Sequence, residues 1–479
     1  MLQLEGYENE EYKKWSNDHM DQLQRLIYTK TSEKSPLVMT DRAKRLYNLT
    51  NSINIIYIFV GVLIRLVFAF IPLWPTVLFV LYCGFLYLFQ YRIILQANAI
   101  RAPKEAAINM GFYRDAQRKI ASLKEQNQLE VVGITGSFGK TSVKFIANTI
   151  LSQEFVVQNT PSSYNTPMGL SKIINNELST DHEVFLAELG AKKIGEIEEV
   201  AQLVQPTIGI ITAVGPTHMH LFHSIANIQR TKYELIEALA DDGVAIFNYD
   251  NEYVRPLADK TTQKTLRYGL EDVELLDVYA TDLKVGALGS DFTLHIKEHG
   301  SWPTHTRLLG EHNIQNLLAA AAAAYALGMG GQAIAKAIEK VEPVEHRLNI
   351  VDGGTGVIVI DDAFNSNPVG ARAALKVLDA FDTGKKIIVT PGMVELGAME
   401  EDENRKLGRE IAQVADIAIL VGPQRTKPIQ EGLREEGYPE EKIHVVKSLD
   451  EATQTLAGLT AKGDVVLFEN DLPDNYDEV

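Results

Sequence analysis

Two long apolar runs dominate the hydropathy pattern near the start of the chain. The first covers residues 53–71 and is interrupted only by Asn54 and Arg65, and the second covers residues 75–95. Each run approaches the ~20 residues that a helix needs to cross about 30 Å of hydrocarbon. Because little more than "PLWP" separates them, the pattern predicts a two-helix transmembrane hairpin over residues 53–97. A buried hairpin in a soluble protein is the alternative interpretation.

The charges around these runs predict an orientation. Basic residues lie before the first run and at or beyond the end of the second: Arg42, Lys44, Arg45, Arg92 and Arg101. Cytoplasmic flanks are enriched in such residues, and a hairpin returns the chain to the side on which it started. We therefore expect a cytoplasmic segment over residues 1–52 and, beyond Asn98, domains that face the cytoplasm from the cytoplasmic membrane. Arg65 is expected to reach the interface or a partner helix, because a charge is costly at the bilayer centre.

The rest of the chain alternates between helical and strand-like patterns. Residues 98–127 are predicted to be a linker helix, because their apolar positions recur with helical spacing. The runs "EVVGIT", "EVFLAELG", "TIGIITAVG" and "GVAIFNYD" then alternate with helical segments over residues 128–345. A second series, "GVIVIDDAF", "KKIIVTPGM", "DIAILVG" and "DVVLFEND", follows over residues 346–479. Such alternation predicts two α/β domains with mainly parallel sheets, and the Ala-rich stretch between them is predicted to be a packed helix.

Composition excludes two classes of function. The net charge of −17 makes the chain a poor candidate for nucleic-acid binding, which needs clustered Lys and Arg to neutralise phosphates. Cys83 is the only cysteine in the sequence, so neither an intramolecular disulfide nor a multi-cysteine zinc site is possible.

The run "VVGITGSFGKTSVKF" predicts a strand, a glycine turn and a helix. Backbone N–H groups in such turns bind phosphate, and the dipole at the helix N-terminus favours the anion. The predicted nucleotide-binding residues here are Gly136, Ser137, Gly139, Lys140, Thr141 and Ser142. Lys140 is expected to reach the β and γ phosphates and Thr141 to ligate Mg²⁺. Ile134 occupies the first glycine position of the usual spacing, so this is a variant loop for ATP or GTP, with a chance glycine-rich turn as the alternative.

Several later motifs, in order, carry a resemblance to a known family. "TGSFGKTS", "FLAELGAKKIGEI", "TAVGPTHMHLF", "RTKYEL", "LLGEHNIQNLLAA", "EHRLNIV", "DDAFNSNP" and "MVELGAMEEDENRKLG" together resemble the Mur ligase family over residues 128–420. They are most similar to its branch that joins a D-alanyl-D-alanine dipeptide to a UDP-linked muramoyl peptide in peptidoglycan synthesis. The resemblance implies a P-loop-type central ATPase domain followed by a Rossmann-like C-terminal domain.

The resemblance also implies a chemistry. A carboxylate attacks the γ-phosphate of ATP to give an acyl phosphate, and an amine then displaces phosphate to form an amide. Both steps concentrate negative charge, which cations must neutralise. The implied catalytic residues are Lys140, Glu188, His218 and Lys232. By the same resemblance, Thr141 helps to hold the Mg²⁺ bound to the nucleotide, Glu188 and His218 hold a second Mg²⁺, and Lys232 is carbamylated. A solvated acid for Glu188 and an exposed helix lysine for Lys232 are the alternatives.

The histidines near His218 offer another possibility. His218, His220 and His223 form an H-x-H-x-x-H pattern that could suggest zinc. Only His218 matches the family pattern, since an acid is usual at the position of His220 and glycine at that of His223. The resemblance therefore favours Mg²⁺ over zinc.

Further residues are implied for nucleotide and substrates. Asn313 and Asn316 are expected to meet the adenine and ribose, with helix capping as the alternative for Asn313. Arg347 and Asp362 are expected to contact phosphate and ribose from the C-terminal domain, or else to form a surface salt bridge. The predicted substrate contacts are Asn165 and Thr166 on the UDP-sugar side and Asn365 and Asn367 on the amine side, with polar loop residues as the alternative.

The chain also departs from the family pattern. The hairpin stands where soluble members of the branch carry an N-terminal domain that grips UDP, and "GDVVLFENDLPDNY" replaces a strand end that usually contains Lys and Ser or Arg. Three hypotheses follow. The chain is a membrane-anchored ligase acting on a UDP-linked precursor, or a ligase acting on a lipid-linked acceptor or an amino-acid polymer, or a non-catalytic ATP-binding scaffold for cell-wall synthesis proteins.

Overall fold

A computed structural model describes residues 7, 9–10, 12–13, 39–68, 74–161, 164–286, 289–344, 346–352, 354–363 and 366–471, without the side chains of His220 and Asp352. The chain divides into two compact units, Met1–Gly111 and Phe112–Val479. The boundary falls inside the predicted linker.

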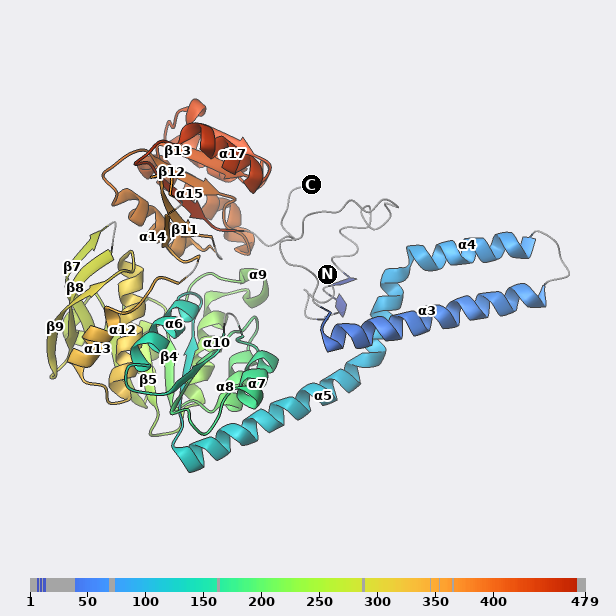
Figure 1. The fold of residues 1–479 in the computed structure, drawn as a ribbon, viewed down its shortest axis with the longest axis horizontal. Helices are drawn as coiled ribbons and strands as arrows, with labels where there is room; N and C mark the ends of the chain where they lie inside the picture. Colours follow the sequence, from blue (N-terminus) through green and yellow to red (C-terminus); the bar gives the residue numbers. More distant parts are fainter. Residues whose placement is uncertain are drawn as a thin grey trace. The chain divides into compact units, whose positions relative to one another are not determined.

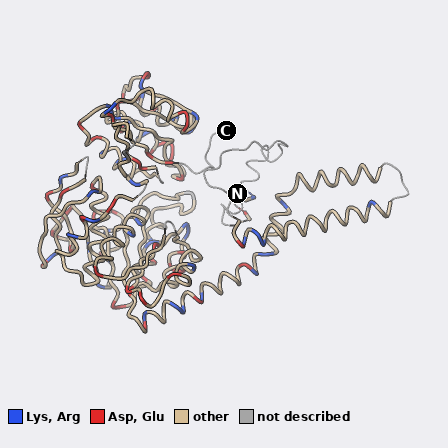
Figure 2. The backbone as a smooth tube through the Cα atoms, in the orientation of Figure 1, with Lys and Arg blue, Asp and Glu red and all other residues tan. Residues whose placement is uncertain are grey.

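The first unit is built from long helices. They are α3 (Asp41–Val67), α4 (Trp74–Leu88) and the first part of α5 (Gln90–Asn127). Thr40 caps α3 by accepting a hydrogen bond from the backbone N–H of Ala43. Figure 1 shows α3 and α4 side by side as a hairpin, and Figure 2 shows that their paired stretch carries few charged residues.

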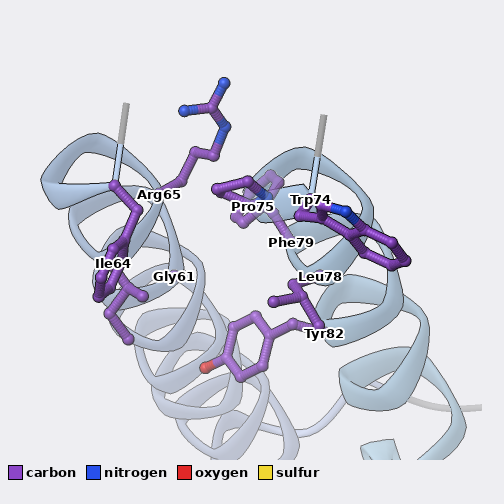
Figure 3. Close-up of a pocket in the computed structure, with 9 residues that line it drawn as sticks. Gly61, Ile64, Arg65, Trp74, Pro75, Leu78, Phe79 and Tyr82 are labelled. Atoms are coloured by element: carbon purple, nitrogen blue, oxygen red, sulfur yellow. The ribbon is translucent and has the colours of Figure 1, made fainter. Parts of the chain in front are cut away.

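Polar contacts fix the register of this hairpin. The side-chain amides of Asn54 and Gln90 donate to each other, with N···O distances of 3.1 and 3.0 Å. Nearer the tip, the Arg65 guanidinium donates to the Thr76 hydroxyl at 3.0 Å. Figure 3 shows Arg65 at the end of the hairpin, above an apolar pocket that Ile64, Leu78 and neighbouring side chains line. Arg65 therefore lies at one end of the paired helices and not at their centre.

The second apolar run is not one straight helix. The pair α4 and α5 bends by 64° at a break that leaves α4 with 15 residues. Among the described residues, α3 alone is long and apolar enough to cross a membrane, and α4 with α5 adds a second candidate if the bent pair forms one span. The predicted linker is also not a separate helix, because α5 continues from Gln90 to Asn127 without a break. The transmembrane hairpin stays a prediction.

The second unit begins with a nine-stranded sheet and its helices. Their bounds are β1 (Glu130–Thr135), α6 (Lys140–Leu151), β2 (Val157–Asn159), α7 (Pro167–Asn176), β3 (Val184–Glu188), α8 (Glu196–Val204), β4 (Ile208–Ile211), α9 (Met219–Phe222), α10 (Ile225–Glu237), β5 (Val244–Asn248), α11 (Arg255–Lys260), β6 (Lys264–Gly269), η1 (Val273–Leu275), β7 (Val278–Gly286), β8 (Gly289–Ile296), β9 (Gly300–Thr306), α12 (Glu311–Ala326) and α13 (Gly331–Ile338). The strand order is β2-β3-β1-β4-β5-β6-β7-β8-β9. Strands β2 to β7 are parallel, whereas β7, β8 and β9 pair antiparallel. The sheet is thus mainly parallel, as predicted, with an antiparallel extension that the sequence pattern did not predict.

A six-stranded sheet forms the C-terminal part of this unit. Its elements are β10 (Asn349–Asp352), β11 (Ile358–Asp362), α14 (Pro368–Asp379), β12 (Lys386–Thr390), η2 (Gly397–Met399), α15 (Glu400–Val414), β13 (Ile417–Val421), α16 (Lys427–Glu435), η3 (Glu440–Lys442), β14 (Ile443–Val446), α17 (Leu449–Leu459) and β15 (Val465–Glu469). The strand order is β10-β11-β15-β12-β13-β14, and all pairs except β10 with β11 are parallel. The strand β15 therefore lies between β11 and β12, although it comes last in the chain.

Helix α12 is packed on all sides, as the Ala-rich stretch predicts. Each alanine from Ala319 to Ala324 has 0% exposed surface. The small side chains let α12 lie against α6, the helix that follows the phosphate loop. The second half of α5 also packs on this unit, because Ala116 and Ile120 are fully buried and Tyr113 donates to the carbonyl of Glu199.

Candidate functional site

The phosphate loop follows β1 at the carboxyl edge of the nine-stranded sheet. Gly136 has φ +155° and Gly139 has φ +83°. A Cβ at Gly136 would lie 2.1 Å from the Thr212 hydroxyl, so only glycine fits this turn. The backbone N–H of Ser137 donates to the carbonyl of Ala213 at 2.7 Å, and its hydroxyl donates to the carbonyl of Gly215 at 3.0 Å. These bonds tie the loop to the segment that follows β4.

The side chain of Lys140 folds back over the loop. Its ammonium donates to the carbonyl of Gly136 at 2.7 Å and to that of Ser137 at 3.3 Å. Burial lowers the pKa of Lys140, Glu188 opposes this shift, and Arg347 adds to it. The lysine therefore lies within electrostatic reach of residues from both sheets, at the helix N-terminus where phosphate is expected.

Glu188 is the centre of a buried polar cluster. It is the last residue of β3 and is 2% exposed. Its carboxylate accepts hydrogen bonds from the Thr141 hydroxyl at 3.0 Å and the Asn165 amide at 3.1 Å. The ammonium of Lys144, with a fully buried side chain, lies 3.1 Å from the same carboxylate. The hydrogen bond from Thr141 brings together two residues that were predicted to hold different Mg²⁺ ions. The burial of Glu188 does not fit the solvated-acid alternative.

The donors of this cluster fit a hard divalent cation. The hydroxyl of Thr141 and the carboxylate of Glu188 are neighbouring oxygen donors of the kind that Mg²⁺ prefers. The ammonium of Lys144, 3.1 Å away, places a positive charge next to the same carboxylate. Thr141 and Glu188 are thus able to hold Mg²⁺ at the phosphate loop.

His218 contacts a carboxylate that was not predicted to lie beside it, and its role as a Mg²⁺ ligand stays a prediction. Its Nδ1 lies 2.7 Å from a carboxylate oxygen of Glu395, which belongs to the segment between β12 and η2. Both His218 and His223 adopt positive φ, at +49° and +63°, and they cap the two ends of α9. The left-handed conformation at His223 is one that glycine adopts without strain. Among the residues whose side chains the structure describes, which leave out His220, no three His, Cys, Asp or Glu side chains gather as a metal site.

Lys232 is buried within α10 and is not an exposed helix lysine. Its side chain is 3% exposed, and the ammonium lies 5.9 Å from the centre of the Phe222 ring. Burial, with a further contribution from the charge of Lys140, lowers the pKa of Lys232 to about 7, against the opposing charges of Glu234 and Glu196. A large fraction of this amine is therefore neutral, and hence nucleophilic, at neutral pH.

A cleft of about 830 Å³, its open mouth included, brings the predicted nucleotide contacts together. Its lining includes seven of the predicted residues: Gly139, Ser142, Asn313, Asn316, Arg347, Asp362 and Asn367. Asn313 donates to the carbonyl of Leu309, and Asn316 donates to the side-chain oxygen of Asn313 at 3.1 Å. Gly310, and not Asn313, is the N-cap of α12, so the capping alternative is wrong.

Arg347 and Asp362 are half-buried groups of this cleft. Burial raises the pKa of Asp362 to about 6, although the Leu348 N–H and the charge of Arg347 lower it. The N–H of Leu348 donates to Asp362 at 3.1 Å. Burial likewise lowers the pKa of Arg347, and Asp362 and Glu188 oppose this shift. The nucleotide roles of Arg347 and Asp362 stay predictions, with the salt bridge as the alternative.

The predicted substrate residues are spread over two places. Asn165 contacts Glu188 in the buried cluster, whereas Thr166 is exposed and caps α7 by accepting from the N–H of Gly169 at 3.3 Å. Asn367 caps α14 by accepting from the N–H groups of Val369 and Gly370, and it lines the cleft. Asn365 lies outside the described residues. Substrate roles for these residues stay predictions.

Three residues of the site were not predicted from the sequence. Lys144 lies one helical turn after Lys140, so the helix period could have placed both lysines on one face. Glu395 occurs within a quoted motif, but its pairing with His218 depends on how two distant segments meet. Ser366 lines the cleft between two predicted asparagines.

These features define the class of protein as a two-domain, phosphate-loop nucleotide-binding protein. Comparison with known sequences is consistent with that class. The Mur ligase middle domain profile matches residues 134–324, and the profile of the Mur ligase glutamate ligase domain matches residues 346–469.

Individual relatives agree. The UDP-N-acetylmuramoyl-tripeptide–D-alanyl-D-alanine ligase of Bacillus subtilis is 28% identical over 343 residues, covering 71% of this chain and 72% of that enzyme. The enzyme of the same name from Mycobacterium tuberculosis is 32% identical, with 61% of this chain and only 58% of that enzyme covered. The solved UDP-N-acetylmuramoylalanyl-D-glutamyl-2,6-diaminopimelate–D-alanyl-D-alanyl ligase of Acinetobacter baumannii superposes with a TM-score of 0.66 at 30% identity, over 75% of this chain and 76% of that one.

The chain therefore belongs to the Mur ligase family, whose members are ATP-dependent amide ligases. The predicted family and enzyme class are confirmed, and the matched fold is the α/β fold of that family. Mur ligases use ATP and Mg²⁺, which fits the cluster around Thr141 and Glu188.

Proposed function

We propose that this chain is a membrane-anchored ligase that joins D-alanyl-D-alanine to a UDP-N-acetylmuramoyl-tripeptide. The observation that supports it most directly is the phosphate loop with Lys140 and Thr141 beside Glu188, in a chain similar to enzymes of that name. The proposed substrates are those that the names of these relatives print.

In this proposal, the tripeptide carboxylate attacks the γ-phosphate of ATP at the loop, and the dipeptide amine then attacks the resulting acyl phosphate. Lys140 and the loop N–H groups stabilise the charge that develops on the transferred phosphate. Mg²⁺, when bound, supplies further neutralisation of phosphate charge. Thr141 and Glu188 would hold it, with the ammonium of Lys144 3.1 Å from Glu188.

A second part of the proposal concerns Lys232, because its amine has the reactivity that carbamylation needs. Carbon dioxide adds to a neutral amine, and the pKa of Lys232 near 7 leaves much of it neutral. The product carries a carboxylate-like group in place of a buried ammonium close to Lys140. We propose that Lys232 is carbamylated in the active enzyme, and that the resulting anion orients Lys140.

Membrane anchoring is supported by the surface of the hairpin. Large apolar side chains on α3 and α4 are exposed, including Ile55, Phe59, Trp74, Leu78 and Leu81. Water disfavours an exposed apolar surface of this kind, and a lipid bilayer would cover it. The basic flanks predict that the catalytic unit faces the cytoplasm.

The test is ligation by the full chain in detergent or lipid nanodiscs. The chain is supplied with ATP, Mg²⁺, the UDP-linked tripeptide and D-alanyl-D-alanine, and phosphate release and product mass are measured. We expect the pentapeptide product, with loss of turnover in Lys140→Ala. ATP-dependent turnover with a lipid-linked muramoyl peptide but not the UDP-linked one would replace the proposed acceptor, and absence of phosphate release with either would favour the scaffold.

A lipid-linked acceptor is the second candidate, and the hairpin favours it. A hairpin with an apolar exterior would hold the catalytic unit beside lipid-borne substrates. The two acceptors are distinguished by offering both in one reaction and weighing the products.

A further inference from the structure

A buried carboxyl group at the carboxyl edge of the six-stranded sheet has no role in the function proposed so far. Glu469 is the last residue of β15, and its neighbours across the sheet are Asp362 at the end of β11 and Thr390 at the end of β12. The carboxyl ends of strands in open α/β sheets are where ligands bind. Glu469 is 1% exposed, so it does not meet a substrate directly.

Two hydroxyl groups contact this carboxyl group. Thr390 donates to one oxygen at 2.6 Å, and Ser366 donates to the other. Thr390 is fully buried, whereas Ser366 lines the cleft that also contains Gly139 and Ser142 of the phosphate loop. Ser366 therefore connects Glu469 to the cleft through a hydrogen bond.

Asn470, the residue after Glu469, holds Ser366 in position. Asn470, at φ +67°, accepts from the Ser366 N–H at 3.2 Å and donates to the carbonyl of Gly392 at 2.6 Å. The segments after β11, β12 and β15 are thus tied together around one carboxyl group. A network in which every member has a partner fixes the direction of its hydroxyl groups.

The protonation of Glu469 depends mainly on its burial. Asp362, its neighbour across the sheet, is a charged group that acts on it, and the charge of Arg347 acts on Asp362. The charged residues of α14, which packs on β15, are engaged elsewhere: Arg372 with Glu403 and Glu410, Lys376 with Glu311, and Asp379 with Lys386. Among the described residues, no ion pair includes Glu469. Burial raises the pKa of Glu469 to about 7, and Asp362 contributes, while the bonds from Ser366 and Thr390 oppose the shift.

We propose that Ser366 contacts the incoming amine and passes one of its protons to Glu469, which acts as the positioning residue and proton acceptor behind it. The inference rests on the proposed function, because that reaction needs an amine that arrives as an ammonium and attacks as a neutral group. A serine hydroxyl can accept a hydrogen bond from the ammonium while it donates to Glu469.

Proton transfer precedes the attack on the acyl carbon. The ammonium gives a proton to the Ser366 oxygen as the Ser366 proton moves to the Glu469 carboxylate, leaving a neutral amine and a neutral carboxyl group. The amine lone pair then forms the C–N bond at the acyl carbon, and the C–O bond to phosphate breaks. The departing phosphate takes the electron pair of that bond and the second amine proton, and Glu469 returns its proton to water through Ser366.

The test compares two nucleophiles that compete for the same acyl phosphate. Hydroxylamine is largely uncharged at neutral pH and needs no proton acceptor before it attacks, whereas the α-amino group of D-alanyl-D-alanine has a pKa of about 8. With both present, full-length protein, ATP and the UDP-linked tripeptide give amide and hydroxamate. The ratio of these products reports the amine step alone.

Glu469→Gln is expected to lower the ratio of amide to hydroxamate about tenfold at pH 7, because only about a tenth of an amine with a pKa near 8 is already neutral there. Hydroxamate formation is expected to persist within about twofold of wild type, since acyl phosphate formation does not involve Glu469. The wild-type amide rate should rise through about pH 7. In the variant that rise should move to about pH 8, where the amine loses its proton unaided.

Two further variants separate proton transfer from structure. Ser366→Ala removes the hydroxyl that passes the proton, so its ratio of amide to hydroxamate should equal that of Glu469→Gln. Thr390→Val removes the other hydrogen bond to the same carboxyl group and should keep the wild-type ratio. An unchanged ratio in Glu469→Gln, or an equal fall in Thr390→Val, would overturn the inference and leave the proposed function standing. If the wild-type protein forms neither product, the proposed function fails, and this inference fails with it.

Discussion

Lys144 and Glu188 form a buried ion pair at the centre of the site. Their side chains are 0% and 2% exposed, so each charge depends on the other for its stability. Removing one partner of a buried pair leaves an uncompensated charge, which costs about 3–5 kcal/mol. Because Glu188 is also a proposed Mg²⁺ ligand, a bound cation can take over part of the role of Lys144.

We therefore predict that Lys144→Met lowers the melting temperature strongly in EDTA, and that Mg²⁺ with ADP restores part of the loss. Thermal denaturation with and without Mg²⁺ measures this, with Lys336→Met, an exposed lysine on α13, as the control. A loss that is the same size in EDTA and in Mg²⁺ would show that Glu188 does not hold the metal.

The buried amine of Lys232 is predicted to lower the free energy of unfolding, although ligation needs it. Its pKa is about 10.4 in the unfolded chain and about 7 in the folded protein. Between these values the unfolded state binds more protons, so the penalty is full below pH 7 and fades as pH rises toward 10. Lys232→Met should therefore melt at a higher temperature than wild type at pH 7 in degassed buffer, with a smaller difference at pH 9, and should lose ligation. A lower melting temperature for the variant at pH 7 would contradict this.

At the scale of elements, the strands that were predicted from short apolar runs are present in the structure. The run "EVVGIT" is β1, and the strands of "GVAIFNYD" and "KKIIVTPGM" are β5 and β12. Buried parallel strands are short continuous apolar runs, which a sequence reveals directly. The antiparallel strands β7 to β9 were missed because their alternating exposed positions resemble a polar loop region.

The residues of the site that belong to sequence motifs could be predicted, whereas several of their partners could not. The cleft contains predicted residues from the loop, α12 and the C-terminal domain. The partners Lys144, Glu395 and Ser366 were not predicted, because each pairing depends on segments that meet only in the folded chain. The bend between α4 and α5 was also missed, since the apolar run continues through it.

The hairpin can be tested through the only cysteine of the chain. Cys83 lies in α4 and is half-buried. If the hairpin spans the bilayer, a membrane-impermeant maleimide should not label Cys83 in inside-out vesicles until detergent is added.

The control carries Cys83→Ser and Ser52→Cys, which moves the thiol to an exposed position on α3 near the basic flank. This variant should be labelled in inside-out vesicles without detergent. Equal labelling of both proteins before detergent would place Cys83 outside the membrane and would favour the soluble hairpin.

At the scale of the whole molecule, the boundary between Gly111 and Phe112 divides α5 into two parts with different roles. The part after the boundary packs on the catalytic unit through Ala116, Ile120 and Leu123. Lys124 also donates to the carbonyl of Gln205 at 2.8 Å. This part of α5 is therefore part of the catalytic body.

Removal of residues 1–111 is predicted to give a soluble protein that still binds ATP. Removal of residues 1–127 should instead give aggregated protein, because it uncovers the apolar surface under Ile120 and Leu123. Gel filtration and nucleotide binding by calorimetry compare the two. If the shorter deletion also aggregates, the catalytic unit depends on the hairpin for its stability.

The alanines of α12 have a consequence for genetics. Ala319 to Ala324 are fully buried, so a larger side chain at one of these positions would clash with its neighbours. Such overpacking lowers the free energy of unfolding by about 1–3 kcal/mol. The same helix carries Asn313 and Asn316 into the nucleotide cleft and packs on α6. Ala320→Val should thus behave as a temperature-sensitive allele, functional in cool cultures and lost on warming. Such an allele would switch off the enzyme within a generation and let the precursors that accumulate identify its substrate in the cell.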